Sequence, residues 1–397
     1  MLLENLNHLS VFKALYFNGP ISCPEISKIT GSSIPNVAKS LTELIKTGIV
    51  EEKGFAFSKG GRKPLIYALD PDQFYIISVA TDQFITKIGL VNLNNDFIGE
   101  VESFEFNLSD KTATAANLVN KIKRFIARLT IDKVKICAIG VTIPGFVDTE
   151  KGISKSFFKE EYGRLRDYIT ESTGYPTFLD NDSSAIALAE LKFGFGREIK
   201  EMMVLNVGWG IGLGMVVKGE IFRGFSGFAG EFSHIPLFKN DKICNCGKRG
   251  CLETEVSLIL IKQQAEKAIA QGETTTIKPD KKGSVDISSV MTEAAKGDAL
   301  AIKLISNAGY HIGRALAVLI HIMNPETIVL SGKGSEAGKL WFAPIQQALN
   351  ELCIPVLLND SNLVLSNLGV NAQLVGGAAL VIEHIDQVIL KKSNSNS

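Results

Sequence analysis

Residues 227–253 read GFAGEFSHIPLFKNDKICNCGKRGCLE, and this stretch gathers four side chains that can bind a metal ion. They are His234, Cys244, Cys246 and Cys251. Three thiolates and one imidazole form a donor set of structural zinc sites, in which protein ligands fill all four positions of a tetrahedral ion. The stretch therefore predicts a Zn²⁺ ion that shapes a loop and leaves no open position for catalysis.

The alternative is that these cysteines are ordinary reduced thiols of an intracellular protein. Three of the six cysteines of the chain fall within this one loop. Gly247 and Gly250 lie between the last two of them and allow the backbone to fold around an ion. The clustering favours the metal site.

The same stretch resembles the zinc and sugar-binding segment of the ROK family, a group of sugar-responsive repressors and sugar kinases. The letters GEFSHI and CNCGKRGCLE carry the resemblance, with Ser233 where the family usually has glycine. The resemblance implies that Glu231, His234 and Glu253 contact sugar hydroxyls. Zinc on one nitrogen of His234 would leave the other nitrogen to face the sugar, so the ion would orient the ring.

Composition limits the possible partners. The 397 residues predict two or three domains with a large core. The chain has 42 basic and 42 acidic residues, so any contact with DNA must come from a local basic patch. No apolar run is long enough to span a membrane, and the start MLLENLNHLS lacks the pattern of a signal peptide. We expect a cytoplasmic protein without membrane contact, because nothing indicates a disulfide framework.

Residues 1–70 begin with the pattern of three helices. The spacing of apolar residues predicts a helix over 6–17, a second from about Pro24 and a third that begins near Ser33. Pro35 suits the first turn of the third helix. We expect this helix to bury one face, formed by Ile34, Val37, Leu41 and Leu44.

Two β-prone segments, residues 49–52 and 65–69, then flank a glycine-rich basic tip. A hairpin after three helices is typical of a winged helix-turn-helix DNA-binding domain. The resemblance agrees, because ROK repressors carry such a domain and the plain kinases lack it. The candidate DNA contacts on the third helix and at the tip are Ser33, Asn36, Lys39, Ser40, Lys59, Arg62 and Lys63.

A winged helix can also dock a protein partner. Residues 1–70 carry eight basic and six acidic side chains, an excess of only two positive charges. The position of the charges favours DNA, because Lys59, Arg62 and Lys63 cluster at the tip. The extended segment Gly61-Arg62-Lys63-Pro64 suits insertion of Arg62 into a narrow minor groove.

Residues 71–397 have the pattern of an α/β protein. Three strands, a helix over about 115–129 and a further strand follow one another, and similar strands start again near Val204. The first four strands are expected at residues 75–81, 86–93, 97–106 and 135–142. This order suits an actin-like, ribonuclease-H-like sugar-kinase fold of two lobes with a ligand cleft between them. We place the lobes at roughly 71–187 plus the C-terminal helix, and at 188–376.

Three expectations concern the later part of the chain. Residues 274–290 are expected to form polar, irregular surface chain. A long helix with an apolar face is expected over 301–322, with a strand over 327–330. Gly376-Gly377 is expected to open a last helix that runs to about Leu390.

Two further segments resemble the sugar side of the family's site. Residues 140–152, GVTIPGFVDTEKG, are similar to a segment that lines the sugar. Residues 179–190, LDNDSSAIALAE, resemble a stretch in which Asn181 and Asp182 would bind sugar hydroxyls, with Asp182 as catalytic base in the kinases. From the residues alone, the same Asp and Asn could simply cap a helix.

The nucleotide side departs from the family's kinases. Their pattern Asp-x-Gly-Gly-Thr-Lys aligns with residues 82–87, in which Phe84 and Ile85 replace the two glycines. A second turn, residues 208–212, has Trp209 where the kinases typically place threonine. Glycines let backbone amides approach a polyphosphate, and bulky side chains block that approach. The sequence therefore predicts a binding protein with degenerate phosphate loops.

Together these patterns predict a transcriptional regulator of carbohydrate genes, most simply a repressor. Its expected partners are operator DNA, a sugar or sugar-phosphate effector, and copies of itself in a homodimer or homotetramer. One alternative is an ATP-dependent ROK sugar kinase with Asp182 as the base. Another is a protein-docking role for the N-terminal helices.

Overall fold

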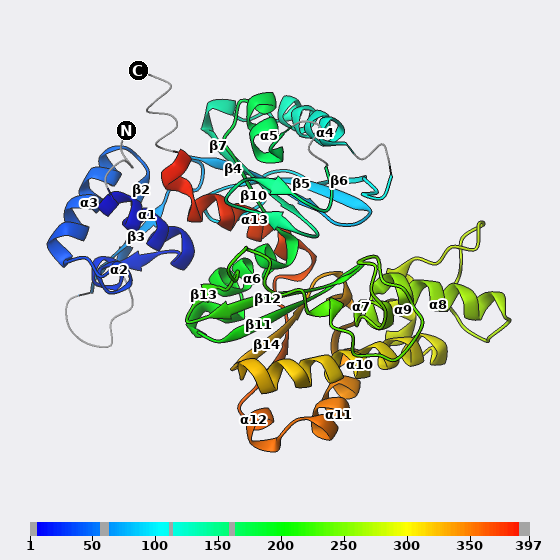
Figure 1. Ribbon diagram of the computed structural model, residues 1–397. Coiled ribbons are helices and arrows are strands. Elements are labelled where there is room, and N and C mark those ends of the chain that lie inside the picture. Colours follow the sequence, from blue (N-terminus) through cyan, green and yellow to red (C-terminus); the bar gives the residue numbers. More distant parts are fainter. Residues whose placement is uncertain (1–5, 56–62, 111–113, 159–162, 389–397) are drawn as a thin grey trace. The chain divides into compact units, whose positions relative to one another are not determined.

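The computed structural model describes residues 6–55, 63–110, 114–158 and 163–388 (Figure 1). Its contacts divide the chain into two units, Met1–Asn181 with Leu374–Ser397, and Asp182–Gln373. The chain thus leaves the first unit after Asn181 and returns to it at Leu374. Among the described residues, no helix has the length and apolar character needed to cross a membrane.

The first unit begins with three helices and a small antiparallel sheet. The helices are α1 (Leu6–Asn18), α2 (Cys23–Thr30) and α3 (Ile34–Lys46). The sheet has the order β1-β3-β2, with β1 (Ile21–Ser22), β2 (Val50–Phe55) and β3 (Leu65–Leu69). A capping box begins α2, where the Ser22 backbone N–H donates to the Glu25 carboxylate over 2.7 Å. The three expected helices and the hairpin strands are therefore present.

Two of the side-chain orientations predicted for α3 are wrong. Ile34 was expected in the buried face, but it lies in the first turn of α3 and is 52% exposed. Ser40 was expected on the exposed face, but it is only 3% exposed. Three residues correspond to about 300° of helical rotation, so Ser40 lies within about 60° of the buried Val37.

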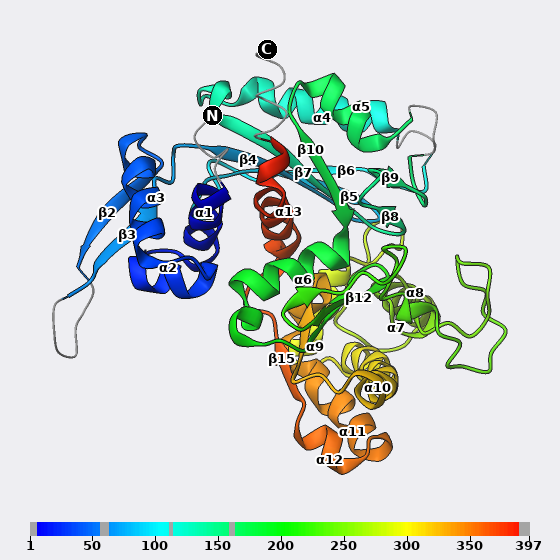
Figure 2. The same ribbon diagram turned by 60° about the vertical axis from the view of Figure 1, so that its left-hand side comes forward.

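A five-stranded sheet forms the centre of the first unit. Its order is β10-β7-β4-β5-β6. The strands are β4 (Tyr75–Thr81), β5 (Ile85–Val91), β6 (Glu102–Glu105), β7 (Ile136–Ile143) and β10 (Thr177–Asn181). Helices α4 (Ala115–Arg128) and α5 (Leu165–Thr173) cover one face, and α13 (Ala372–Glu383) covers the other (Figures 1 and 2). Strand β6 is shorter than the predicted 97–106.

Helix α13 packs closely on this sheet. A Cβ atom added to Gly140 of β7 would lie 2.0 Å from the Gly377 carbonyl oxygen, so only glycine permits the contact. The Ser78 hydroxyl of β4 donates to the Leu374 carbonyl over 2.6 Å. The expectation that Gly376-Gly377 opens the last helix was wrong, because this pair lies inside α13. Close packing, rather than helix initiation, explains the glycine at position 377.

Side-chain bonds join α1 to the rest of the first unit. The Tyr16 hydroxyl is hydrogen bonded to the side-chain oxygen of Asn95, in the turn after β5. Lys13 Nζ donates to the Glu383 carbonyl at the end of α13 over 2.5 Å and lies 3.7 Å from the Asp386 carboxylate. Helix α1 therefore contacts both the turn that follows β5 and the end of α13.

The second unit is built on another five-stranded sheet, of order β13-β12-β11-β14-β15. Its strands are β11 (Met202–Val207), β12 (Ile211–Val217), β13 (Glu220–Ile221), β14 (Thr327–Ser331) and β15 (Asn362–Leu365). Helix α6 (Asp182–Phe193) follows β10 and packs on β12. The apolar core lies against the 25-residue helix α10 (Ala299–Met323). Further helices are α8 (Leu258–Ala270), α9 (Ile287–Ala295), α11 (Phe342–Leu352) and α12 (Pro355–Asn359).

One expectation for this unit was wrong. Residues 274–290 were predicted to form irregular surface chain. Ile277, Val285 and Val290 are instead buried in the core, and α9 begins at Ile287. Isolated apolar residues among polar ones show no periodicity, so their burial could not be read from the sequence.

Candidate functional site

The four candidate metal ligands lie together in the second unit. One ligand atom from each of His234, Cys244, Cys246 and Cys251 can be chosen so that all lie within 4.8 Å of one another. The Cys246 and Cys251 sulfurs are 3.6 Å apart, and the Cys244 sulfur is 3.5 Å from His234 Nδ1. A tetrahedral zinc ion requires sulfur–sulfur edges of about 3.8 Å and sulfur–nitrogen edges of about 3.6 Å. These two separations therefore match two edges of a zinc tetrahedron.

Backbone contacts hold the metal loop in this shape. The Cys244 N–H donates to the Lys248 carbonyl over 2.8 Å, and the Gly247 N–H donates to the Cys244 carbonyl over 2.8 Å. Gly250 has φ +75°, and a Cβ there would lie 2.1 Å from the Phe238 carbonyl oxygen. Burial raises the pKa of the Cys244 thiol to about 12. A divalent cation reverses this effect, because a coordinated thiol loses its proton.

Acidic side chains lie near the second nitrogen of the His234 ring. Nδ1 of His234 faces Cys244, whereas Nε2 lies 3.7 Å from the Glu231 carboxylate. Glu253 begins the short helix α7 (Glu253–Val256), and its carboxylate lies 3.7 Å from the Cys244 sulfur. Burial, with the charges of Asp182 and Glu253, raises the pKa of Glu231, and His234 opposes the shift. Three acidic side chains therefore converge beside one imidazole.

Asp182 is held at the start of α6. Its carboxylate accepts the Ser183 backbone N–H over 2.8 Å and the Asn206 side-chain amide over 3.2 Å. Asn206, on β11, was not predicted as a site residue. The sequence offers one weak signal for Asn206, its position two residues before the glycine-rich turn. Its bond to Asp182 joins residues 24 positions apart, which sequence spacing does not indicate.

Asn181 closes the first unit, one residue before Asp182. Its side-chain Nδ2 donates to the Gly145 carbonyl oxygen over 2.9 Å. Gly145 belongs to the segment predicted to line a sugar site. Of the five predicted sugar contacts, Asp182, Glu231, His234 and Glu253 are therefore close to one another within the second unit.

The sequence profile of the ROK family matches residues 86–384, three-quarters of the chain. The chain belongs to the ROK family. A xylose repressor of Caldicellulosiruptor bescii is 30% identical over 388 residues, which cover 96% of each protein.

Solved ROK structures have the same fold. The structure of a ROK family transcriptional regulator, a homologue of the E. coli MLC protein, superposes with a TM-score of 0.79 at 27% identity and covers 99% of each chain. A ROK glucokinase from Streptomyces griseus, solved with glucose and AMPPNP, superposes with a TM-score of 0.68 at 24% identity. That match covers 98% of the glucokinase but only 77% of this chain. The mixed α/β fold is thus common to ROK regulators and ROK kinases.

The two turns that the sequence comparison predicted to correspond to the phosphate loops of ROK kinases are both described. In the first, the Asp82 carboxylate accepts the backbone N–H groups of Phe84 and Ile85, each over 2.7 Å. In the second, Trp209 packs against the core of its unit. A Cβ on Gly210 would lie 2.6 Å from the Glu253 carboxylate. The second turn therefore lies directly against a predicted sugar ligand.

The candidate DNA contacts of this ROK protein are only partly described. Ser33, Asn36 and Lys39 are exposed on α3, and Lys63 is exposed before β3. Lys59 and Arg62 lie outside the described residues. Ser40 is buried and does not share the exposed face of α3.

Proposed function

We propose that this ROK protein is a sugar-responsive transcriptional repressor of carbohydrate genes. One observation carries the proposal. The match to a xylose repressor covers 96% of both proteins, whereas the glucokinase match leaves about a quarter of this chain uncovered. The ROK family model begins at residue 86, so the N-terminal helices and hairpin lie outside it. We assign residues 1–70 as a winged helix-turn-helix DNA-binding domain and residues 71–397 as the sugar-binding domain.

The sugar ligands are Asn181, Asp182, Glu231, His234 and Glu253. The carboxylates accept hydrogen bonds from sugar hydroxyls, and a ligand that lacks a hydroxyl leaves a buried acceptor unpaired. Zn²⁺, held by His234 and the three cysteines, fixes the loop that carries the histidine and Glu253. In this role the ion supplies architecture and no step of chemistry.

The protein acts on DNA through α3 and the tip of the β2–β3 hairpin. Ser33, Asn36 and Lys39 on α3 contact base edges or phosphates, and Lys59, Arg62 and Lys63 contact the backbone and minor groove. A homodimer or homotetramer presents two such domains to a palindromic operator. A hundredfold change in operator affinity requires a coupling free energy of about 2.7 kcal/mol.

A ROK sugar kinase is the second candidate function, because the site retains Asp182 as a possible general base. Phe84, Ile85 and Trp209 argue against it, since they replace the glycines and the hydroxyl that would approach a triphosphate. Calorimetric titration with ATP in the presence of sugar tests this alternative. Binding heat and transfer of phosphate to the sugar would establish the kinase.

The decisive experiment measures binding to the DNA upstream of the protein's own gene by fluorescence anisotropy. Purified zinc-loaded protein is titrated at two salt concentrations, and D-xylose, D-glucose, N-acetyl-D-glucosamine and their phosphates are then added. Specific binding that one of these sugars weakens supports the proposal. Absence of specific DNA binding at low salt would refute it.

A further inference from the structure

A small hairpin lies beside the predicted sugar ligand Asn181. It consists of β8 (Val147–Asp148) and β9 (Ile153–Ser154), which pair in antiparallel register. The segment that leads into it contains Gly145, whose carbonyl accepts the Asn181 side-chain amide. The position of this hairpin therefore decides where the acceptor of Asn181 lies.

Hydrogen bonds within the hairpin hold both its tip and its base, so we treat it as a rigid element. At the tip, the Asp148 carboxylate accepts the Lys151 backbone N–H over 3.0 Å and pairs with its ammonium group at 3.2 Å. That backbone bond, more than any other contact, holds the pKa of Asp148 below its usual value. At the base, the Phe146 N–H donates to the Ser156 hydroxyl over 2.9 Å, and the Lys155 N–H donates to the Phe146 carbonyl over 2.8 Å.

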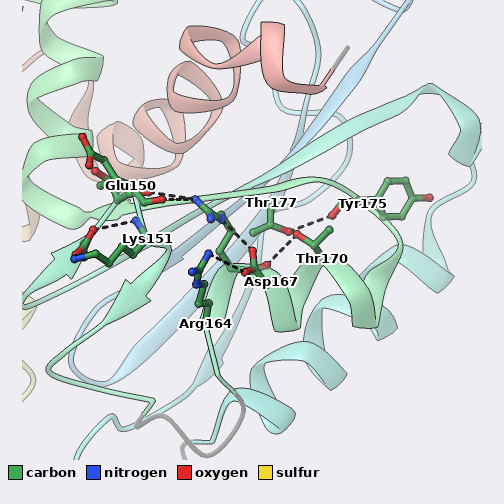
Figure 3. Close-up of polar contacts among 10 residues, drawn as sticks. Glu150, Lys151, Arg164, Asp167, Thr170, Tyr175 and Thr177 are labelled. Atoms are coloured by element: carbon green, nitrogen blue, oxygen red, sulfur yellow. Dashed lines mark hydrogen bonds and ion pairs between the residues drawn. The ribbon is translucent and has the colours of Figure 1, made fainter. Parts of the chain in front are cut away.

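Arg166, in the first turn of α5, holds the tip of the hairpin. Its Nη1 donates to the Glu150 carbonyl over 3.0 Å and to the Thr149 carbonyl over 3.4 Å. Its backbone N–H donates to the Gly152 carbonyl over 3.1 Å. Its Nε donates to the Asp167 carboxylate over 3.2 Å, which orients the guanidinium (Figure 3). The arginine side chain is 20% exposed and so is largely screened from water.

The side chain of Arg166 packs directly against the backbone of Gly152. Gly152 has φ +70°, and a Cβ there would lie 2.6 Å from Arg166 Cβ and 2.8 Å from its Nε. Any side chain at position 152 would therefore displace the guanidinium or the tip. Glycine at this position lets the side chain of Arg166 lie flat against the turn.

We propose that Arg166 is a positioning residue of the sugar site, which acts through the hairpin on Asn181. A carbonyl accepts only from the NH₂ end of an amide, so the Gly145 oxygen turns the side-chain oxygen of Asn181 away from itself. Displacement of the hairpin removes that constraint and leaves the amide without a set orientation for a sugar hydroxyl. Lysine cannot replace arginine here, because one ammonium group lacks the planar fork that spans two carbonyls and a carboxylate. The inference rests on the proposed sugar-binding function.

The test compares Arg166→Gln with Arg164→Gln in the full-length, zinc-loaded protein. Arg164 is the matched control: it is 57% exposed and lies 3.9 Å from the same Asp167. Among the described residues, it forms no hydrogen bond or ion pair with the hairpin. Sugar affinity is measured by calorimetry with D-xylose, D-glucose and N-acetyl-D-glucosamine, and backbone hydrogen exchange is followed at residues 145–155. We expect Arg166→Gln to weaken sugar binding about tenfold, as orienting groups around a site do, and to speed exchange in the hairpin. Operator affinity without sugar should not change.

A double-mutant cycle separates positioning from a general loss of structure. In an Asn181→Ala background, Arg166→Gln should cause no further loss of sugar affinity. Additive losses, or wild-type affinity in the single variant, would overturn the inference. If Arg166→Gln fails to fold, Arg166→Lys takes its place in the same cycle. If the wild-type protein binds none of the three sugars, the proposed function fails, and unchanged exchange at residues 145–155 in the variant would separately refute the role of Arg166.

Discussion

The Tyr16 hydroxyl is hydrogen bonded to the side-chain oxygen of Asn95, and this bond joins the first helix of the chain to the turn that follows β5. Tyr16 is 3% exposed, and burial raises the pKa of its phenol above the usual range. The phenol is therefore neutral at neutral pH and can donate this bond. Breaking this bond would leave the buried phenol without its partner, so displacement of the turn at Asn95 carries a cost at α1.

Tyr16→Phe should destabilise the first unit by about 1 kcal/mol, the usual net value of a hydrogen bond. It should also reduce the effect of sugar on DNA binding. Urea unfolding and anisotropy titrations with and without sugar measure the two effects. Tyr310→Phe is the control, because that hydroxyl donates to Glu351 at the surface of the second unit. Equal effects of the two substitutions on sugar response would contradict a role for the Tyr16 bond.

Cys246→Ser should lower zinc content and sugar affinity together. Cys246 is exposed, so its loss creates no cavity in the core, yet its sulfur belongs to the metal cluster. Zinc content by inductively coupled plasma mass spectrometry and sugar affinity by calorimetry check the result. Cys23→Ser removes a thiol outside the cluster and should leave both unchanged. Normal sugar binding by a zinc-free sample would separate the ion from recognition.

Glu190 should make the second unit less stable as pH rises. Its carboxyl group is fully buried and accepts the Ser366 hydroxyl, and burial raises its pKa despite that bond. The folded state therefore favours the protonated form, so this contribution to stability is complete below the ordinary pKa of glutamate and is lost as pH rises through the raised pKa. The substitution Glu190→Gln keeps the size of the side chain but removes the ionisable carboxyl group.

Thermal unfolding at pH 5 and pH 8 tests this sign. The midpoint temperature of unfolding of Glu190→Gln should rise relative to that of the wild type as pH increases from 5 to 8. Glu293→Gln is the control, because a hydrogen bond from Lys296 lowers the pKa of Glu293. Its contribution to stability is present above the ordinary pKa of glutamate and is lost only at lower pH, so the difference between Glu293→Gln and the wild type should be the same at pH 5 and pH 8. A pH-independent difference between Glu190→Gln and the wild type would show that Glu190 does not titrate in this range.

Asp182→Asn should abolish sugar binding and leave operator binding intact. The substitution removes an acceptor for sugar hydroxyls but keeps the size of the side chain. Its Oδ1 can still accept the Ser183 N–H that caps α6. Calorimetry and anisotropy on the same preparation measure the two activities, and circular dichroism checks the fold. Retained sugar affinity would remove Asp182 from the binding set.

Lys39→Ala should weaken binding to all DNA sequences and reduce the slope of log affinity against log salt by about one, as expected for a lost phosphate contact. Lys123→Ala on α4 makes the same charge change on an exposed helix outside residues 1–70 and is the control. Ser40→Ala should leave DNA affinity unchanged, because Ser40 is buried. A salt slope that is the same for Lys39→Ala and the wild type would argue against α3 as the DNA-reading helix.

The metal cluster could be predicted from sequence because three cysteines and one histidine in a single loop are themselves a pattern of metal ligands. Asn206 and Arg166 could not be found in this way. Each acts on a partner about 16 to 24 residues away, and only the folded sheets and hairpin bring them together. Helical periodicity located α3 but misplaced Ser40, because one buried stripe covers positions that flank its apolar residues as well.

The wing and the late helix show two other limits. The charges at 59 and 62 are evident in the sequence, but they fall outside the described residues. The prediction that Gly376-Gly377 opens the last helix is wrong, although glycine is unfavourable inside a helix. The reason for the glycine at position 377, its contact with Gly140 across 237 positions of the chain, has no local signature.

The return of the chain to its first unit at Leu374 has a consequence for biosynthesis. Gly140 and Lys13 leave the ribosome early. The C-terminal segment that packs on Gly140 and accepts a hydrogen bond from Lys13 is translated only after the whole of residues 182–373. The nascent chain must therefore carry an uncovered β-sheet face throughout that interval. A premature stop codon shortly before position 374 would yield a product with an intact second unit and a permanently incomplete first one, which makes it a substrate for chaperones and proteases.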